Sequence, residues 1–192
     1  MLNFLQCPID FLKKQEFDIL FAKYQFTKIN KNAECLIVNP GTELLINKNY
    51  LKNFPNLKII GTPSTGTNHI DLIYLKKNNI KLFSLLDDRK SLNKITASAE
   101  FTWLHIMNAV RKFNLSINEV SNWRSVNNEK KLRSNELSEK KIGIIGFGRI
   151  GKKVAKYAKA FDMNIFFYDP KVNSSKFASK VNRISDLSKC DI

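Results

Sequence analysis

Cysteine is scarce in this chain of 192 residues, and its three copies, Cys7, Cys35 and Cys190, lie far apart. An odd number at this spacing fits neither a metal motif nor a disulfide framework, so we expect no metal site and a reducing compartment. Long apolar runs and a cleavable signal pattern are also missing. These absences predict a cytoplasmic protein with no membrane partner.

Acidic residues and arginine are few relative to lysine. The chain has 32 Lys and Arg against 17 Asp and Glu, a formal net charge of +15, but only six of the basic residues are arginine. Such a charge alone would suggest a nucleic-acid-binding module. The lysines are scattered through all segments, so we expect a compositional bias and no nucleic-acid partner. A steep salt dependence of DNA or RNA binding would revive that alternative.

The remaining composition is that of a globular protein, with 43% hydrophobic and 26% charged residues. Short apolar runs alternate with amphipathic stretches, which predicts β-α-β units and parallel sheets, an α/β fold. Strands are expected at 35–38, stopped by Asn39-Pro40-Gly41, and at 57–60 and 80–86, with a helix at 70–79. A long helix is expected at 96–113, followed by a solvated, partly helical connection over 121–141.

One glycine-rich motif carries a specific chemistry. A strand over 141–145 runs into Gly146-Phe147-Gly148-Arg149-Ile150-Gly151, and a helix pattern follows. A second strand over 163–168 ends at Asp169, about twenty residues after the motif. A G-x-G-x-x-G sequence in this context is typical of dinucleotide binding.

Each glycine has a distinct role in that interpretation. Gly146 permits a tight turn out of the strand, and Gly148 lets the backbone approach a pyrophosphate without a Cβ. Gly151 lets the new helix pack closely on the strand. The helix start, at Arg149 and Ile150, offers free N–H groups to the phosphates.

Asp169 favours NAD over NADP in the same interpretation. Its carboxylate would accept hydrogen bonds from the adenosine ribose hydroxyls, and its charge would repel a 2′-phosphate. The Arg149 side chain would contact a phosphate or lie at the surface. The structural alternative is a simple glycine-rich turn, with Asp169-Pro170 opening another turn.

Three stretches in combination resemble the D-isomer-specific 2-hydroxyacid dehydrogenases, the family that includes D-3-phosphoglycerate dehydrogenase. They are residues 57–72 (LKIIGTPSTGTNHIDL), residues 96–103 (TASAEFTW) and residues 136–170. The resemblance implies a flavodoxin-like substrate domain over residues 1–100. An NAD-binding Rossmann domain over residues 101–192 would follow, truncated after its second strand and the following helix.

The resemblance also implies a substrate loop. In the family, the loop matching Ser64, Thr65 and Gly66 holds the substrate carboxylate with backbone N–H groups, a geometry that suits an anion. An ordinary strand-to-helix loop is the structural alternative. Thr102 matches the head of the family's long helix, where it would lie near the nicotinamide or would only pack the helix start.

The family's catalytic arginine, carboxylate and histidine lie beyond the part that this chain resembles. Residues 188–192 match the opening of the third strand of the dinucleotide domain. We therefore expect an N-terminal fragment with no catalytic residue, no turnover and at most weak NADH binding. His69 and His105 are not expected to substitute for the family's histidine.

The resemblance thus predicts an NAD-dependent oxidoreductase acting on the CH–OH group of a small 2-hydroxy or 2-oxo acid, and a homodimer at full length. A regulatory protein that senses dinucleotides on the same scaffold stays open as an alternative. The presence of the three catalytic residues in the complete gene would distinguish the two.

Overall fold

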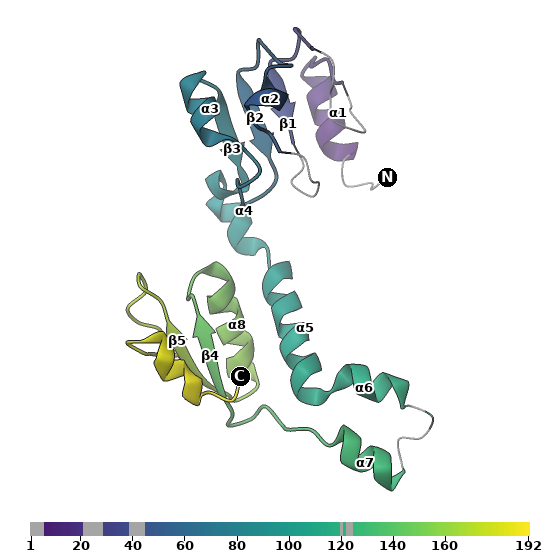
Figure 1. The fold of residues 1–192 in the computed structure, drawn as a ribbon, viewed down its shortest axis with the longest axis vertical. Helices are drawn as coiled ribbons and strands as arrows, with labels where there is room; N and C mark the ends of the chain where they lie inside the picture. Colours follow the sequence, from purple (N-terminus) through teal and green to yellow (C-terminus); the bar gives the residue numbers. More distant parts are fainter. Residues whose placement is uncertain (1–5, 21–28, 39–44, 120, 122–124) are drawn as a thin grey trace. The chain divides into compact units, whose positions relative to one another are not determined.

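A computed structural model describes residues 6–20, 29–38, 45–119, 121 and 125–192. The chain divides into two compact units, residues 1–89 and 90–192 (Figure 1). This division falls before the expected domain boundary at residue 100. In the described part of the chain, no helix is long and apolar enough to cross a membrane.

The first unit contains a parallel three-stranded sheet in the order β1-β2-β3. Its strands are β1 (Cys35–Ile37), β2 (Ile59–Thr62) and β3 (Lys81–Ser84). Its helices are α1 (Gln6–Lys14), α2 (Lys48–Leu51), α3 (Leu72–Lys77) and the 3₁₀ helix η2 (Leu85–Asp87). Ile46, Leu51, Ile60 and Leu75 are among the residues of its buried core.

The strands of this unit lie close to where the apolar runs predict them. β2 begins later than expected and continues through Gly61 to Thr62. β3 ends at Ser84, because the Ser84 and Asp87 side chains form a capping box that starts η2. The predicted stop at Asn39-Pro40-Gly41 lies outside the described residues.

The second unit is built on another parallel sheet, in the order β4-β5-β6. Its strands are β4 (Lys141–Ile145), β5 (Asn164–Tyr168) and β6 (Ser179–Lys180). Helix α4 (Arg89–Lys94) starts at the boundary between the units, and the later helices are α5 (Ala97–Arg111), α6 (Phe113–Asn118), α7 (Val126–Leu132), α8 (Arg149–Ala160) and the 3₁₀ helix η4 (Ile184–Lys189). The expected α/β class with parallel sheets is confirmed.

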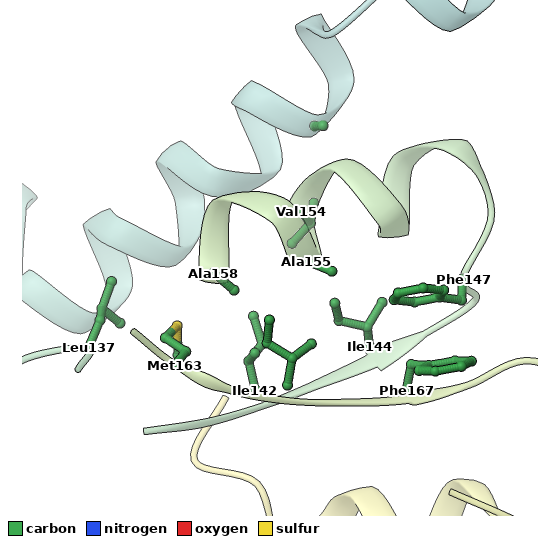
Figure 2. Packing of buried hydrophobic residues seen from close by; sticks show 11 residues of the cluster. Leu137, Ile142, Ile144, Phe147, Val154, Ala155, Ala158, Met163 and Phe167 are labelled. Carbon is green, nitrogen blue, oxygen red and sulfur yellow. The ribbon is translucent and has the colours of Figure 1, made fainter. Parts of the chain in front are cut away.

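The core of the second unit lies between the sheet and α8 (Figure 2). Val154, Ala155 and Ala158 form the buried stripe of α8 and face Ile142 and Ile144 of β4. The two alanines leave no room between helix and sheet, so they are completely buried. This close packing fixes the start of α8 relative to the end of β4.

The long helix predicted over 96–113 is confirmed as α5, which ends two residues before the predicted end. α5 ends at Arg111, because Lys112 adopts a left-handed conformation with φ 52°, and α6 starts at the next residue. Thr96 is the N-cap of α5 but makes no side-chain capping bond. In the described residues of the expected solvated connection, 121 and 125–141, the structure has helix α7.

The sequence predicts a helix after the second strand of this domain and the start of a third strand at residues 188–192. The structure differs from this prediction. After β5 the structure has the short strand β6 and the 3₁₀ helix η4, with no α-helix between them. Asp191 and Ile192 then join the opposite edge of β4, where the N–H of Gly143 donates to the Ile192 carbonyl at 2.8 Å. The third strand of this sheet is therefore β6, and residues 191–192 come after it instead of starting it.

Candidate functional site

The glycine-rich turn joins β4 to α8 in the second unit. Gly146 has φ +91°, a conformation that side-chain-bearing residues rarely adopt. Its N–H donates to the Tyr168 carbonyl at 2.8 Å, which holds the start of the turn against the end of β5. The turn therefore requires a glycine where the sequence places the first one.

The other two glycines of the motif meet opposite environments. A Cβ on Gly151 would lie 2.2 Å from the Gly146 carbonyl oxygen and 3.2 Å from the Ile144 side chain, so the helix start touches the turn. A Cβ on Gly148 would have nothing within 4 Å. The fold thus explains Gly151, whereas Gly148 faces open space.

Phe147 anchors the turn, a role that the glycine-rich motif does not predict. Its ring is 1% exposed and stacks on Phe167 of β5, with centroids 4.0 Å apart and planes 23° apart (Figure 2). An aromatic residue between two glycines, matched by an aromatic residue in the next strand, is the signal that would have indicated this contact.

Asp169 lies directly after β5 and touches the turn. Its Oδ2 accepts a hydrogen bond from the N–H of Phe147 at 2.7 Å. Its Oδ1 accepts from the N–H groups of Lys171 at 2.7 Å and Val172 at 2.9 Å. The backbone bonds from Lys171, Phe147 and Val172 lower the pKa of Asp169, with a smaller contribution from the charge of Lys180. The carboxylate is therefore ionised at neutral pH.

The start of α8 offers free backbone donors. The N–H of Lys152 donates a hydrogen bond to the Gly148 carbonyl at 3.0 Å. Before it in α8, the N–H groups of Arg149 and Ile150 have no acceptor among the described residues. The Arg149 guanidinium donates to the Ile95 carbonyl at 3.1 Å, a contact that local sequence does not predict. The helix amides and the Arg149 side chain are thus separate positive features at one helix end.

A cavity of about 300 Å³ lies beside the turn. It brings together Thr102, Gly146, Ile150 and Gly151 from the predicted cofactor set, while Gly148, Arg149 and Asp169 are not part of its lining. The Thr102 hydroxyl donates to the Ser98 carbonyl at 2.8 Å, within its own helix. The cavity also has an apolar wall, made by Ile106, Ile142, Ile144, Ile145, Val154 and Ile192 together with Gly143.

These features fit a dinucleotide. The turn leaves space for an approaching group at Gly148, free amides lie at the start of α8, and an ionised carboxylate follows the second strand. A pyrophosphate needs the first two features, and an adenosine ribose needs the third.

The predicted substrate loop lies in the first unit, after β2. The Ser64 hydroxyl donates to the Gly66 carbonyl at 2.6 Å and lies 3.0 Å from the Thr62 hydroxyl oxygen. Leu85 donates its N–H to the Ser64 carbonyl at 3.1 Å. The loop is thus held by the Ser64 side chain and by Leu85 of η2, and the N–H groups of residues 65–67 have no acceptor among the described residues.

The two histidines do not join either group of residues. His105 packs edge-on against Phe101 of α5, with ring centroids 4.4 Å apart. The Nε2 atom of His69 is buried without a hydrogen-bond partner. In the described ranges, no group of three or more His, Cys, Asp or Glu side chains has the geometry to hold a metal ion.

Two family models match most of the chain. The model described as "D-isomer specific 2-hydroxyacid dehydrogenase, catalytic domain" matches residues 4–89. The model described as "D-isomer specific 2-hydroxyacid dehydrogenase, NAD binding domain" matches residues 103–191, which include the glycine-rich turn and Asp169. The two matches fall within the two structural units.

Individual relatives agree with these matches. The chain is 32% identical over 163 residues to D-3-phosphoglycerate dehydrogenase of Methanocaldococcus jannaschii, covering 83% of this chain and 29% of the relative. It is 30% identical over 162 residues to hydroxypyruvate reductase of Thermotoga maritima, covering 83% of this chain and 50% of the relative. The chain therefore spans half or less of the length of these relatives.

Solved structures show the same fold. D-lactate dehydrogenase from Aquifex aeolicus, solved with NAD and lactic acid, matches with a TM-score of 0.70 and 26% identity, over 92% of this chain and 53% of that one. NAD-dependent formate dehydrogenase from Staphylococcus aureus, solved with NAD, matches with a TM-score of 0.68 and 24% identity, over 81% and 46%. The first of these structures contains both a dinucleotide and a hydroxy acid.

Proposed function

Because the chain belongs to the D-isomer specific 2-hydroxyacid dehydrogenase family, we propose that it supplies the NAD-binding and acid-binding elements of an NAD-dependent oxidoreductase. The reaction is the interconversion of the CH–OH group of a small 2-hydroxy acid and the corresponding 2-oxo acid. The observation that carries this proposal is the turn at Gly146–Gly151, which is rigidly held yet open at Gly148.

Different residues of the second unit bind different parts of NAD. The free N–H groups at the start of α8 and the Arg149 side chain bind the pyrophosphate, and Asp169 accepts a ribose hydroxyl while its charge disfavours a 2′-phosphate. Thr102, Ile150 and the apolar cavity wall surround the nicotinamide end. NAD supplies the hydride acceptor or donor when it is bound.

The substrate acid binds the loop of Ser64, Thr65 and Gly66 in this proposal. The N–H groups of residues 65–67 have no acceptor among the described residues, and several free amides on one loop suit a carboxylate. The hydroxyl of Ser64 is engaged with the Gly66 carbonyl and so stabilises the loop conformation rather than contacting the acid.

Replacing Gly148 by alanine tests cofactor binding at the turn. Because the added methyl meets no protein atom within 4 Å, we expect the free energy of unfolding to change by less than about 0.5 kcal/mol. The methyl would occupy the space of the pyrophosphate, so NADH affinity should fall at least about tenfold. Titration of the whole chain with NADH, followed by NADH fluorescence, measures this change.

The matched control is Gly66→Ala in the first unit, where an added Cβ also has nothing within 4 Å. This variant should bind NADH as the unchanged chain does. Equal NADH affinities for the unchanged chain and Gly148→Ala would contradict cofactor binding at the turn.

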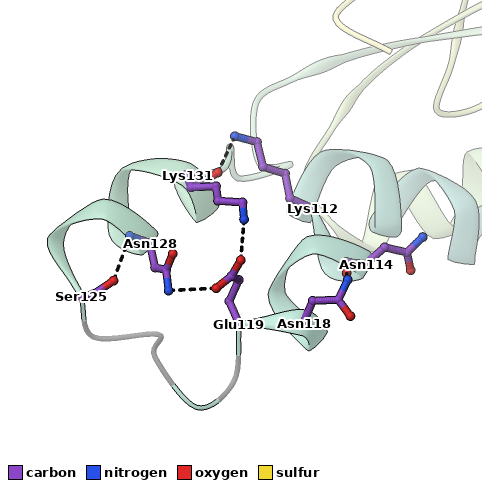
Figure 3. A network of polar contacts seen from close by, with 7 residues as sticks. All are labelled: Lys112, Asn114, Asn118, Glu119, Ser125, Asn128 and Lys131. Atoms are coloured by element: carbon purple, nitrogen blue, oxygen red, sulfur yellow. Dashed lines mark hydrogen bonds and ion pairs between the residues drawn. The ribbon is translucent and has the colours of Figure 1, made fainter.

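We further propose that the whole protein is a homodimer that pairs through the helical arm of α6 and α7. Phe113 and Ile117 of α6 are each 53% exposed, and Leu115 and Val126 are also exposed. The arm is fastened by its own polar contacts (Figure 3): Glu119 accepts from Asn128 and Lys131, and the Lys112 ammonium donates to the Lys131 carbonyl. A preformed arm with exposed apolar side chains is suited to bury them against a second copy.

A charge placed on the apolar side of the arm tests this pairing. Ile117→Glu should weaken dimer formation at least about tenfold, because an unpaired carboxylate would be buried in the interface. Asn114→Glu adds the same charge on the same helix at a polar position and should leave the dimer intact. Sedimentation velocity over a range of concentrations measures the dissociation constant. A monomer at all concentrations, or equal dimer strength in all variants, would contradict the proposal.

We propose that the protein is cytoplasmic. Its three cysteines lie far apart in the sequence, which suits a reducing environment. The two other classes, a dinucleotide sensor and a nucleic-acid-binding module, gain no support from the relatives described above, which carry the names of dehydrogenases and reductases.

A further inference from the structure

The Asp169 carboxylate is held entirely by backbone donors. Two of them, the N–H groups of Lys171 and Val172, belong to the turn that follows Asp169 itself. The third, the N–H of Phe147, belongs to the glycine-rich turn 22 residues earlier in the chain. The Asp169 side chain is therefore fixed by its own turn and also hydrogen-bonds to the glycine-rich turn.

This arrangement leaves little of the carboxylate for a ligand. A carboxylate oxygen accepts about two hydrogen bonds. Oδ1 already accepts two, from Lys171 and Val172, and Oδ2 accepts one, from Phe147. One acceptor position on Oδ2 is left, which is enough for a single ribose hydroxyl. Most of the hydrogen-bonding capacity of Asp169 is thus directed at the protein.

The bond to Phe147 acts on the peptide group that leads into α8. The Gly146 N–H and the Phe147 ring are already held by Tyr168 and Phe167 of β5. These two contacts fix the ends of the Gly146–Phe147 segment, but neither fixes the orientation of the peptide plane between them. Gly146, with φ +91°, gives that plane freedom to rotate, and the bond to Asp169 removes this freedom.

We propose that Asp169 is a positioning residue for the phosphate-binding turn, in addition to any contact that it makes with the ribose. By holding the Phe147 N–H, it orients the backbone from Gly146 to Gly148 before the cofactor arrives, so that the amides at the start of α8 are ready to bind a pyrophosphate. This inference rests on the proposed NAD-binding function. Because the bond is charge-assisted, it is stronger than one made by a neutral acceptor.

An NAD analogue that lacks both hydroxyls of the adenosine ribose separates the two roles. If Asp169 acts only on the ribose, Asp169→Ala should not weaken binding of this analogue. If Asp169 also positions the turn, Asp169→Ala should weaken binding of the analogue at least about fivefold. Removing a negative charge near a pyrophosphate would by itself strengthen binding, so a loss cannot be attributed to charge. Asp162→Asn, which removes an equal charge at an exposed site in the same unit, should bind the analogue as the unchanged chain does.

Hydrogen exchange of the whole chain without ligand tests the same inference independently. The Phe147 amide should exchange at least about tenfold faster in Asp169→Ala, whereas the amides of Ile165 and Phe167 in β5 should keep their rates. Unchanged β5 rates show that the unit is folded. An unchanged Phe147 rate, or an unchanged or stronger affinity for the analogue, would overturn the positioning role. Failure of the unchanged chain to bind NAD even weakly would contradict the proposed function but leave the exchange result to decide on the turn.

Discussion

Gly151→Ala is expected to destabilise the second unit by about 3 kcal/mol. The added methyl carbon would lie 2.2 Å from the Gly146 carbonyl oxygen, far inside the van der Waals contact distance. That oxygen is a backbone atom of a turn held by β5, so it cannot move away as a flexible side chain would. Relief requires α8 to separate from β4, which breaks the packing of Val154, Ala155 and Ala158.

The sign of this effect is informative. In the interior of an ordinary helix, glycine to alanine stabilises by about 1 kcal/mol, so a loss identifies close contact between helix and turn. Trp103 lies in α5 of the second unit, and the other tryptophan, Trp123, also comes after residue 89 in the sequence, so urea unfolding followed by tryptophan fluorescence reports on this unit. Gly148→Ala is the matched control and should unfold at the same urea concentration as the unchanged chain. A stable Gly151→Ala variant would contradict the close packing.

Phe147→Ala is expected to lower the free energy of unfolding by about 4 kcal/mol, because it removes a fully buried ring and leaves a cavity beside Phe167. The turn would also lose the contact that holds it on β5, so NADH affinity should fall in conditions where the unit is still folded. Urea unfolding and NADH titration measure the two effects.

Phe101→Ala is the control for the loss of an aromatic ring. Phe101 is 61% exposed on α5, so its removal should cost less than about 1 kcal/mol. A similar small cost for Phe147→Ala would show that the Phe147 ring does not anchor the turn.

The elements around the turn were predictable because their signals are local. An apolar strand, three glycines at fixed spacing and a helical apolar stripe define β4, the turn and α8 without reference to distant residues. The positive φ at Gly146 and the contact at Gly151 correspond to the first and third of these glycine roles.

The features that sequence reasoning missed depend on residues far apart in the chain. The bond from Phe147 to Asp169 joins two turns, and the bond from Arg149 to the Ile95 carbonyl spans 54 residues. Periodicity carries no information about either bond. The left-handed Lys112 was missed for a different reason: lysine is not a usual helix terminator, and the apolar pattern continues across it.

The most direct test of cofactor binding at the glycine-rich turn is an NMR titration of the whole isotope-labelled chain with NAD. We expect saturable shifts of the amide resonances of Gly146–Gly151 and of residues 169–172, which disappear in Gly148→Ala. Shifts spread over lysines throughout the chain, or shifts that persist unchanged in Gly148→Ala, would contradict the assignment of this turn as the dinucleotide site.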